Sequence, residues 1–96
     1  MAIEDYTKTI SINSSYINAY YNRGIIYAKK KRLYNRAIDD FSKVIELNPN
    51  DAQAINNRGN VYELSGIINR AISDFQKACD MGNENGCKNV HRIIGR

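Results

Sequence analysis

Residues 19–49 read AYYNRGIIYAKKKRLYNRAIDDFSKVIELNP, and residues 54–83 return to the same pattern as AINNRGNVYELSGIINRAISDFQKACDMGN. A shorter copy, AIEDYTKTISIN at residues 2–13, aligns with AIDDFSKVIELN at residues 37–48. The 96-residue chain therefore consists largely of one unit, written twice in full and preceded by its second half. Repetition at such a short period is typical of architectures in which similar units stack on one another.

The distance between the two full copies changes within the unit. Gly24 and Gly59 are 35 positions apart, whereas Phe41 and Phe75 are 34 apart. The first copy therefore carries one additional residue between its two halves, near residues 30–32.

Hydrophobic spacing predicts helices along the whole unit. Tyr20, Gly24 and Tyr27 are spaced by four and three positions, which places them on one stripe of a helix over residues 16–31. Phe41 lies on the apolar face of a second helix, which Asn48-Pro49 ends. The predicted helices after the first cover residues 34–47, 52–65, 68–81 and 84–94.

Glycine inside a helix costs about 1 kcal/mol relative to alanine, so Gly24 and Gly59 need a packing reason. Close approach of the second helix of each unit supplies that reason. Ala37 and Ala71 are small residues on the second helices, which fits the same close approach.

Polar residues and glycine indicate where these helices begin and end. Asn50 or Asp51 is expected to cap the helix that follows it, and Ser14 or Ser15 the equivalent helix of the first copy. Gly82 is expected to end a helix in the left-handed conformation.

The pattern resembles the tetratricopeptide repeat, a helix-turn-helix unit of about 34 residues. The matching residues are Tyr20, Gly24, Tyr27, Ala37, Phe41 and Pro49, then Ile55, Gly59, Tyr62, Ala71 and Phe75. Arg23 and Arg58 depart from the usual leucine before the glycine, and Asn83 stands where the second copy would carry its proline. The resemblance implies an all-α fold, a right-handed superhelical stack of about six helices arranged in antiparallel pairs.

The same resemblance divides the chain, which we expect to form a single domain over residues 1–96. Its parts are a half repeat at 2–13, full repeats at 16–49 and 51–83, and a capping helix at 84–96.

The composition restricts the location and the partners. No apolar run approaches the ~18 residues of a membrane span, so we expect no membrane partner. The N-terminus, MAIEDYTKTI, has early acids and no apolar signal region, which makes the cytoplasm the default location. A piece of a longer exported protein would look the same.

The chain is basic, with 14 basic and 10 acidic residues and a formal net charge of +4. Much of the excess lies in one cluster: Lys29, Lys30, Lys31, Arg32 and Arg36. This cluster fits a solvated turn, or contact with phosphates or an acidic partner. We do not expect a nucleic-acid partner, because the chain lacks the basic stripe with interleaved aromatic residues that a nucleic-acid groove needs.

In tetratricopeptide arrays the first helix of each pair lines a concave groove, and the resemblance implies such a groove here. Its residues would be Asn18, Tyr21, Asn22, Ile25, Lys29, Gln53, Asn56, Asn57, Asn60 and Glu63. Amide side chains both donate and accept hydrogen bonds, which suits an extended peptide or a second helix. Tyr21 and Ile25 add an apolar anchor. Abundant asparagine also fits a general compositional bias, since asparagine fills the loops of this chain as well.

Three positions of this stripe differ between the copies: Tyr21 corresponds to Asn56, Ile25 to Asn60 and Ala28 to Glu63. Because the scaffold repeats its packing residues, we expect these divergent positions to carry specificity.

Some tetratricopeptide domains clamp the C-terminal carboxylate of heat-shock chaperones with lysine, asparagine and arginine. Asn22 matches one clamp asparagine, but Gln53 and Asn57 stand where lysine and arginine are needed. We therefore do not expect this activity.

The segment from Lys77 to Cys87 resembles the junction of the Sel-like repeats, relatives of this family. Some secreted members bridge two cysteines with the spacing of Cys79 and Cys87. The resemblance implies a disulfide that fastens the last helix, whereas two free, packed thiols are the expectation for the cytosol. Both states fit the sequence.

Nothing in the sequence forms a catalytic constellation. There is a single histidine, no Gly-rich phosphate loop and no inward carboxylate pair with a base. Cys79, Cys87 and His91 supply only three zinc ligands. We expect no metal, no cofactor and no enzymatic activity.

The leading hypothesis is a protein-interaction module or scaffold that holds a peptide or helix in its groove. An alternative is a structural unit that self-associates head-to-tail or by exchange of terminal helices. The ends of the chain that would then meet carry Ile3, Tyr6 and Ile10, and Val90, Ile93 and Ile94. A third reading is nucleic-acid binding, resting on the basic turn alone.

Overall fold

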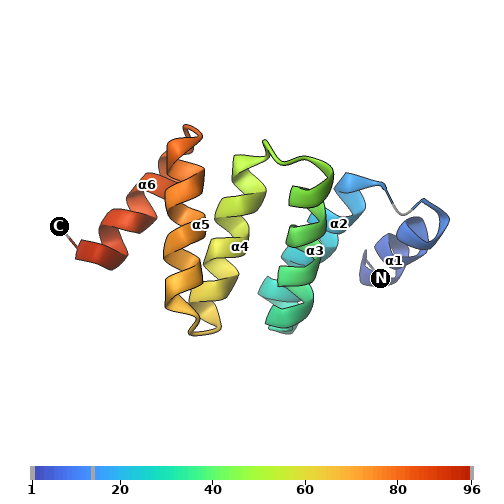
Figure 1. The fold of residues 1–96 in the computed structure, drawn as a ribbon. Coiled ribbons are helices and arrows are strands. Elements are labelled where there is room, and N and C mark those ends of the chain that lie inside the picture. The colour runs from blue at the N-terminus through green and yellow to red at the C-terminus, as the bar shows by residue number, and fades with distance from the viewer. Residues whose placement is uncertain (1, 14, 96) are drawn as a thin grey trace.

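The computed structural model describes residues 2–13 and 15–95, which form a stack of helices (Figure 1). The α-helices of this part are α1 (Ala2–Ile12), α2 (Ile17–Ile26), α3 (Tyr34–Leu47), α4 (Ala52–Leu64), α5 (Ile68–Asp80) and α6 (Glu84–Val90). Two π-helical turns, η1 (Tyr27–Lys31) and η2 (His91–Gly95), continue α2 and α6. The predicted all-α solenoid is confirmed, with each helix packed against the next.

The stack is elongated, with extents of 45 × 25 × 16 Å and the two ends of the chain at opposite ends (Figure 1). Its core is a ribbon of small clusters along the stack rather than one central core. Phe41 and Phe75, at most 1% exposed, are its largest fully buried side chains. No helix within the described residues is long and apolar enough to cross a membrane.

Within each full repeat the first helix approaches the second at a glycine, as the sequence predicts. A Cβ added to Gly24 would lie 3.1 Å from Cε1 of Phe41. A Cβ added to Gly59 would lie only 2.8 Å from the same atom of Phe75. Because glycine has no Cβ, the first helix of each repeat can pack directly against the phenylalanine of the second.

The additional residue of the first copy is absorbed where its two halves join. In the second copy the amide of Ile67 donates to the carbonyl of Tyr62 at 2.8 Å, and Gly66 lies in the left-handed region at φ 84°. In the first copy the amide of Leu33 donates to the carbonyl of Tyr27 at 2.9 Å, so the closing bond spans one more residue. That residue widens the helix into the π-helical turn η1.

Arg32 occupies the left-handed position in this first turn, at φ 53°. Among the described residues it is the one non-glycine residue with positive φ. The left-handed conformation costs an L-residue roughly 1 to 2 kcal/mol, a cost that its counterpart Gly66 avoids.

The helix caps follow the sequence in part. Asp51 caps α4, its Oδ1 accepting from the amide of Ala54 at 3.1 Å, and Gly82 is left-handed at φ 97°. The expectation for α2 was wrong for Ser15, because the cap position is Tyr16, which makes no capping side-chain bond. Ser14, the other expected cap, lies outside the described residues.

The terminal helices bury much of their apolar surface inward. Ile3 and Ile10 of α1 pack against core clusters, as do Val90 and Ile93 at the other end. Ile94 is 57% exposed.

Candidate binding groove

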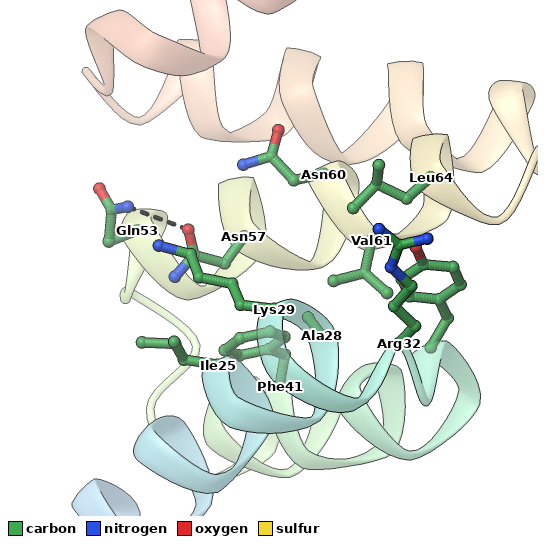
Figure 2. Close-up of a pocket in the computed structure, with 11 residues that line it drawn as sticks. Ile25, Ala28, Lys29, Arg32, Phe41, Gln53, Asn57, Asn60, Val61 and Leu64 are labelled. Carbon is green, nitrogen blue, oxygen red and sulfur yellow. Dashed lines mark hydrogen bonds between the residues drawn. The ribbon is translucent and has the colours of Figure 1, made fainter.

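A cleft of about 640 Å³ lies between the first helices of the two full repeats, α2 with η1 on one side and α4 on the other (Figure 2). Five residues of the predicted stripe line it: Ile25, Lys29, Gln53, Asn57 and Asn60. The remaining lining comes from Ala28, Arg32, Tyr34, Phe41, Val61 and Leu64. The cleft therefore combines an apolar floor with an amide-rich wall and a cationic rim.

The amides of the wall are partly bound to one another. Gln53 donates to Oδ1 of Asn57 at 3.1 Å, and Asn57 donates to the hydroxyl of Tyr21 at 3.0 Å (Figure 2 shows the first of these bonds). Asn83 donates to Oε1 of Gln53 at 3.4 Å. No hydrogen bond is recorded for the side chain of Asn60 within the described residues. Asn60 is thus the amide of this wall that is available to a ligand.

Tyr21 connects three helices rather than standing open as an anchor. Its ring meets Phe41 of α3 edge to face, with centroids 5.9 Å apart, while its hydroxyl accepts from Asn57 of α4. Burial of the phenol raises the pKa of Tyr21, and the hydrogen bond from Asn57 only partly opposes this effect. Ile25 is the member of the predicted apolar pair that lines the cleft.

Two predicted groove residues are covered by the C-terminal segment. Asn56 is only 3% exposed, and its Oδ1 accepts from Asn89 of α6 at 3.1 Å. Glu63 accepts two hydrogen bonds of 2.7 Å from Arg92 of η2, which lower the pKa of the glutamate. The expectation that Asn56 and Glu63 line an open groove is therefore corrected, because the last helix packs over this face of α4.

These contacts also explain why some groove positions differ between the two copies. Tyr21 bonds to the next first helix, α4, and its counterpart Asn56 bonds to the next one after that, α6. Glu63 likewise contacts η2. Each such position meets a different neighbour, so the neighbouring helix accounts for the divergence at Tyr21/Asn56 and at Glu63.

Asn18 and Asn22, the remaining members of the predicted stripe, lie on α2 outside the lining of the cleft. Asn18 is exposed and Asn22 is half-buried.

A pair of buried ion pairs, which the sequence analysis missed, fixes the walls of the cleft. Arg23 of α2 donates from Nε and Nη2 to both carboxylate oxygens of Asp40 on α3, at 2.8 and 2.7 Å. Arg58 of α4 binds Asp74 of α5 in the same way, at 2.8 and 2.9 Å. These hydrogen bonds raise the pKa of both arginines. The signal was present as Arg-Gly and Asp-Phe recurring together in both copies.

Each of these arginines also reaches the preceding repeat. Nη1 of Arg23 donates to the hydroxyl of Thr7 on α1, and Nη1 of Arg58 to that of Ser42 on α3, both at 3.1 Å. One guanidinium therefore connects three consecutive helices, which sets the position of α2 and α4 on which the cleft depends.

At the C-terminal junction a disulfide joins Cys79 of α5 to Cys87 of α6, with Cα atoms 4.6 Å apart. Gly86 permits this approach, because a Cβ there would lie 2.7 Å from the carbonyl oxygen of Phe75. His91 is exposed, and no group of three or more His, Cys, Asp or Glu residues able to hold a metal is found in the described chain.

Comparisons with known proteins agree with this geometry. Two family models, each described as tetratricopeptide repeat, match residues 17–51 and 41–80. Among curated proteins no match is found.

Several solved structures superimpose well on this chain, two of them of tetratricopeptide domains. The second such domain of human RPAP3, in complex with the HSP70 peptide SGPTIEEVD, has a TM-score of 0.87 and 26% identity, over 98% of this chain and 79% of that one. The second domain of Spaghetti (RPAP3), bound to the HSP90 peptide SRMEEVD, has a TM-score of 0.76 and 28% identity, over 82% and 72%. A crystal structure of MamA has a TM-score of 0.78 and 28% identity, over 85% of this chain, which spans only 47% of that one.

Proposed function

Because this chain belongs to the tetratricopeptide repeat family, we propose that it is a protein-interaction module that holds a peptide in the cleft between α2 and α4. The observation that carries the proposal is the cleft itself, about 640 Å³ lined by apolar and amide side chains. Two similar structures hold the peptides SGPTIEEVD and SRMEEVD, which supports a peptide as the ligand class.

The wall of the cleft argues for a different peptide from those two. Gln53 and Asn57 are neutral and bonded to each other, so they offer no cation to a terminal carboxylate at that end. The cations of the cleft, Lys29 and Arg32, come instead from η1 and the residue that follows it.

The test fills the cleft without touching the core. Asn60→Trp places an indole in the cleft, whereas Ser73→Trp, at an exposed position of α5 that does not line it, is the matched control. Both variants should keep the helical circular dichroism of the wild type. Peptides selected on the wild type from a random array should bind Ser73→Trp equally well and Asn60→Trp at least about tenfold more weakly. Equal binding by both variants would contradict the proposal.

A second candidate, assembly through α1, is favoured by one observation. Asp5 and Tyr6 occupy the positions on α1 that Asp40 and Phe41 occupy on α3, where the latter pair receives Arg23 and its neighbouring glycine. Asp5 is exposed, and no ion pair is recorded for it within the described residues. A first helix from a second copy would fit this face. Sedimentation of the wild type should then show association that Asp5→Ala weakens; a monomer at high concentration excludes it.

The disulfide between Cys79 and Cys87 supports the finer resemblance of this junction to the Sel-like repeats. Alkylation followed by mass spectrometry of the purified chain should find both thiols protected until a reductant is added.

A further inference from the structure

Arg32 has an unfavourable backbone conformation, and its side chain lines the cleft. Its φ is 53°, whereas the second copy places Gly66 at the same point of the turn with φ 84°. Glycine would remove the strain without disturbing the turn. A non-glycine residue held in this region points to a role for its side chain, and Arg32 is one of the residues that line the cleft (Figure 2).

The guanidinium of Arg32 has no recorded partner within the described chain. The other arginines of that part are all held by a carboxylate or by a tyrosine ring: Arg23, Arg36, Arg58, Arg70 and Arg92. Guanidinium groups present a planar fork that matches a carboxylate through two hydrogen bonds. Arg32 therefore presents this fork unused at the cleft.

Lys29 adds a second cation to the same cleft and likewise has no ion pair recorded in the described residues. No aspartate or glutamate is among the residues that line the cleft. Glu63, a nearby acid of α4, is engaged by Arg92. Two unpaired cations beside a cleft without carboxylates create a local positive potential that attracts an anion.

Resting on the proposed function, we propose that the peptide bound in this cleft presents a carboxylate to Arg32 and an apolar side chain to the floor beside it, with Lys29 adding positive potential from the other end of the cleft. Val61 and Leu64 provide that floor, at the end of the cleft where Arg32 lies. Asn60 is available for the backbone of the peptide. The carboxylate is either an Asp or Glu side chain or the C-terminus of the peptide.

The test separates recognition from stability through two substitutions at one position. Arg32→Gly relieves the strained φ, so this variant should melt higher than the wild type while losing affinity for its peptide by about tenfold or more. Arg32→Gln keeps a polar side chain and should lose affinity similarly. Lys30→Gln, a neutralised neighbour in η1 that does not line the cleft, should bind as the wild type does.

The probes are the peptides selected from the random array, each remade with Asp→Asn or Glu→Gln and each with a free or an amidated C-terminus. Loss of binding on the first change identifies a side-chain carboxylate, and loss on amidation identifies the terminus. Peptides that bind the wild type and Arg32→Gly equally, or that bind equally without any carboxylate, would overturn this inference and leave the proposed function standing. If no peptide binds the wild type, both fall together.

Discussion

Asp74 accepts two hydrogen bonds from Arg58, at 2.8 and 2.9 Å, with the carboxylate side chain only 8% exposed. The same arrangement joins Asp40 to Arg23 one repeat earlier. Arginine thus stands where the family usually has leucine, and it pairs with an acid on the facing helix. The exchange turns an apolar contact into a directional one that recurs in each full repeat.

Removing one partner of this pair should cost more than removing both. Asp74→Ala leaves the guanidinium of Arg58 half-buried without its carboxylate, so we expect a loss of about 3 kcal/mol in the free energy of unfolding. The double variant Asp74→Ala with Arg58→Leu restores an apolar contact and should recover most of it. Urea denaturation of both variants measures the difference, and Asp39→Ala, an exposed neighbour of Asp40, serves as control. A double variant as unstable as the single one would contradict this account.

The two close glycines should respond differently to alanine. At Gly59 the new methyl group would lie 2.8 Å from the fully buried ring of Phe75, so Gly59→Ala should destabilise the fold by about 1 to 3 kcal/mol. At Gly24 the nearest atom of Phe41 is 3.1 Å away. The higher helix propensity of alanine, worth about 1 kcal/mol, should offset much of the cost there. Thermal denaturation of both variants checks this order of stability. A Gly24→Ala variant that is less stable than Gly59→Ala would contradict it.

The pair of Glu63 and Arg92 predicts an acid-sensitive attachment of η2. Hydrogen bonds from Arg92 lower the pKa of Glu63, so the pair stabilises the fold above the ordinary pKa of glutamate. This contribution is lost as the pH falls through the lowered value. Because the pair is partly exposed, it should be worth less than about 1 kcal/mol. A carboxyl NMR titration should show the pKa of Glu63 rising in Arg92→Gln, and an unchanged titration would mean that the pair does not form in solution.

Tyr21 predicts an effect at the alkaline end. Burial raises the pKa of its phenol, so the neutral form stabilises the fold below the ordinary pKa of tyrosine, and this contribution is lost as the pH rises through the raised value. Tyr21→Phe also removes the hydrogen bond with Asn57 and should cost about 1 kcal/mol at neutral pH. The stability difference between wild type and Tyr21→Phe should therefore shrink at alkaline pH. Unfolding measured near pH 8 and above about pH 10 tests this, since a constant difference would exclude ionisation of Tyr21 as the cause.

The repeat in the sequence was sufficient to predict the helices and the role of Gly24 and Gly59, because packing positions must recur wherever the same helices meet. It was insufficient for Asn56 and Glu63. Their positions on α4 were correct, but which face the final helix covers depends on Asn89 and Arg92, beyond the second copy, where no repeated pattern guides the comparison.

The arginine pairs were missed for a different reason. Arg23 and Arg58 each depart from the leucine usual at their own position, and that departure alone does not indicate the acid on the facing helix. The joint recurrence of Arg-Gly and Asp-Phe in both copies is the signal of this pairing. The unused fork of Arg32 had no such signal, since the turn that holds it occurs in one copy only.

That turn has a consequence for how the array can change. One residue added to a regular α-helix rotates everything beyond it by about 100°, which would face the next helix the wrong way. Here η1 takes up the residue locally, and the second helix still meets Gly24 through Phe41 as its counterpart meets Gly59. The junction between the two helices of a repeat can therefore change in length and charge without altering how the helices on either side of it pack.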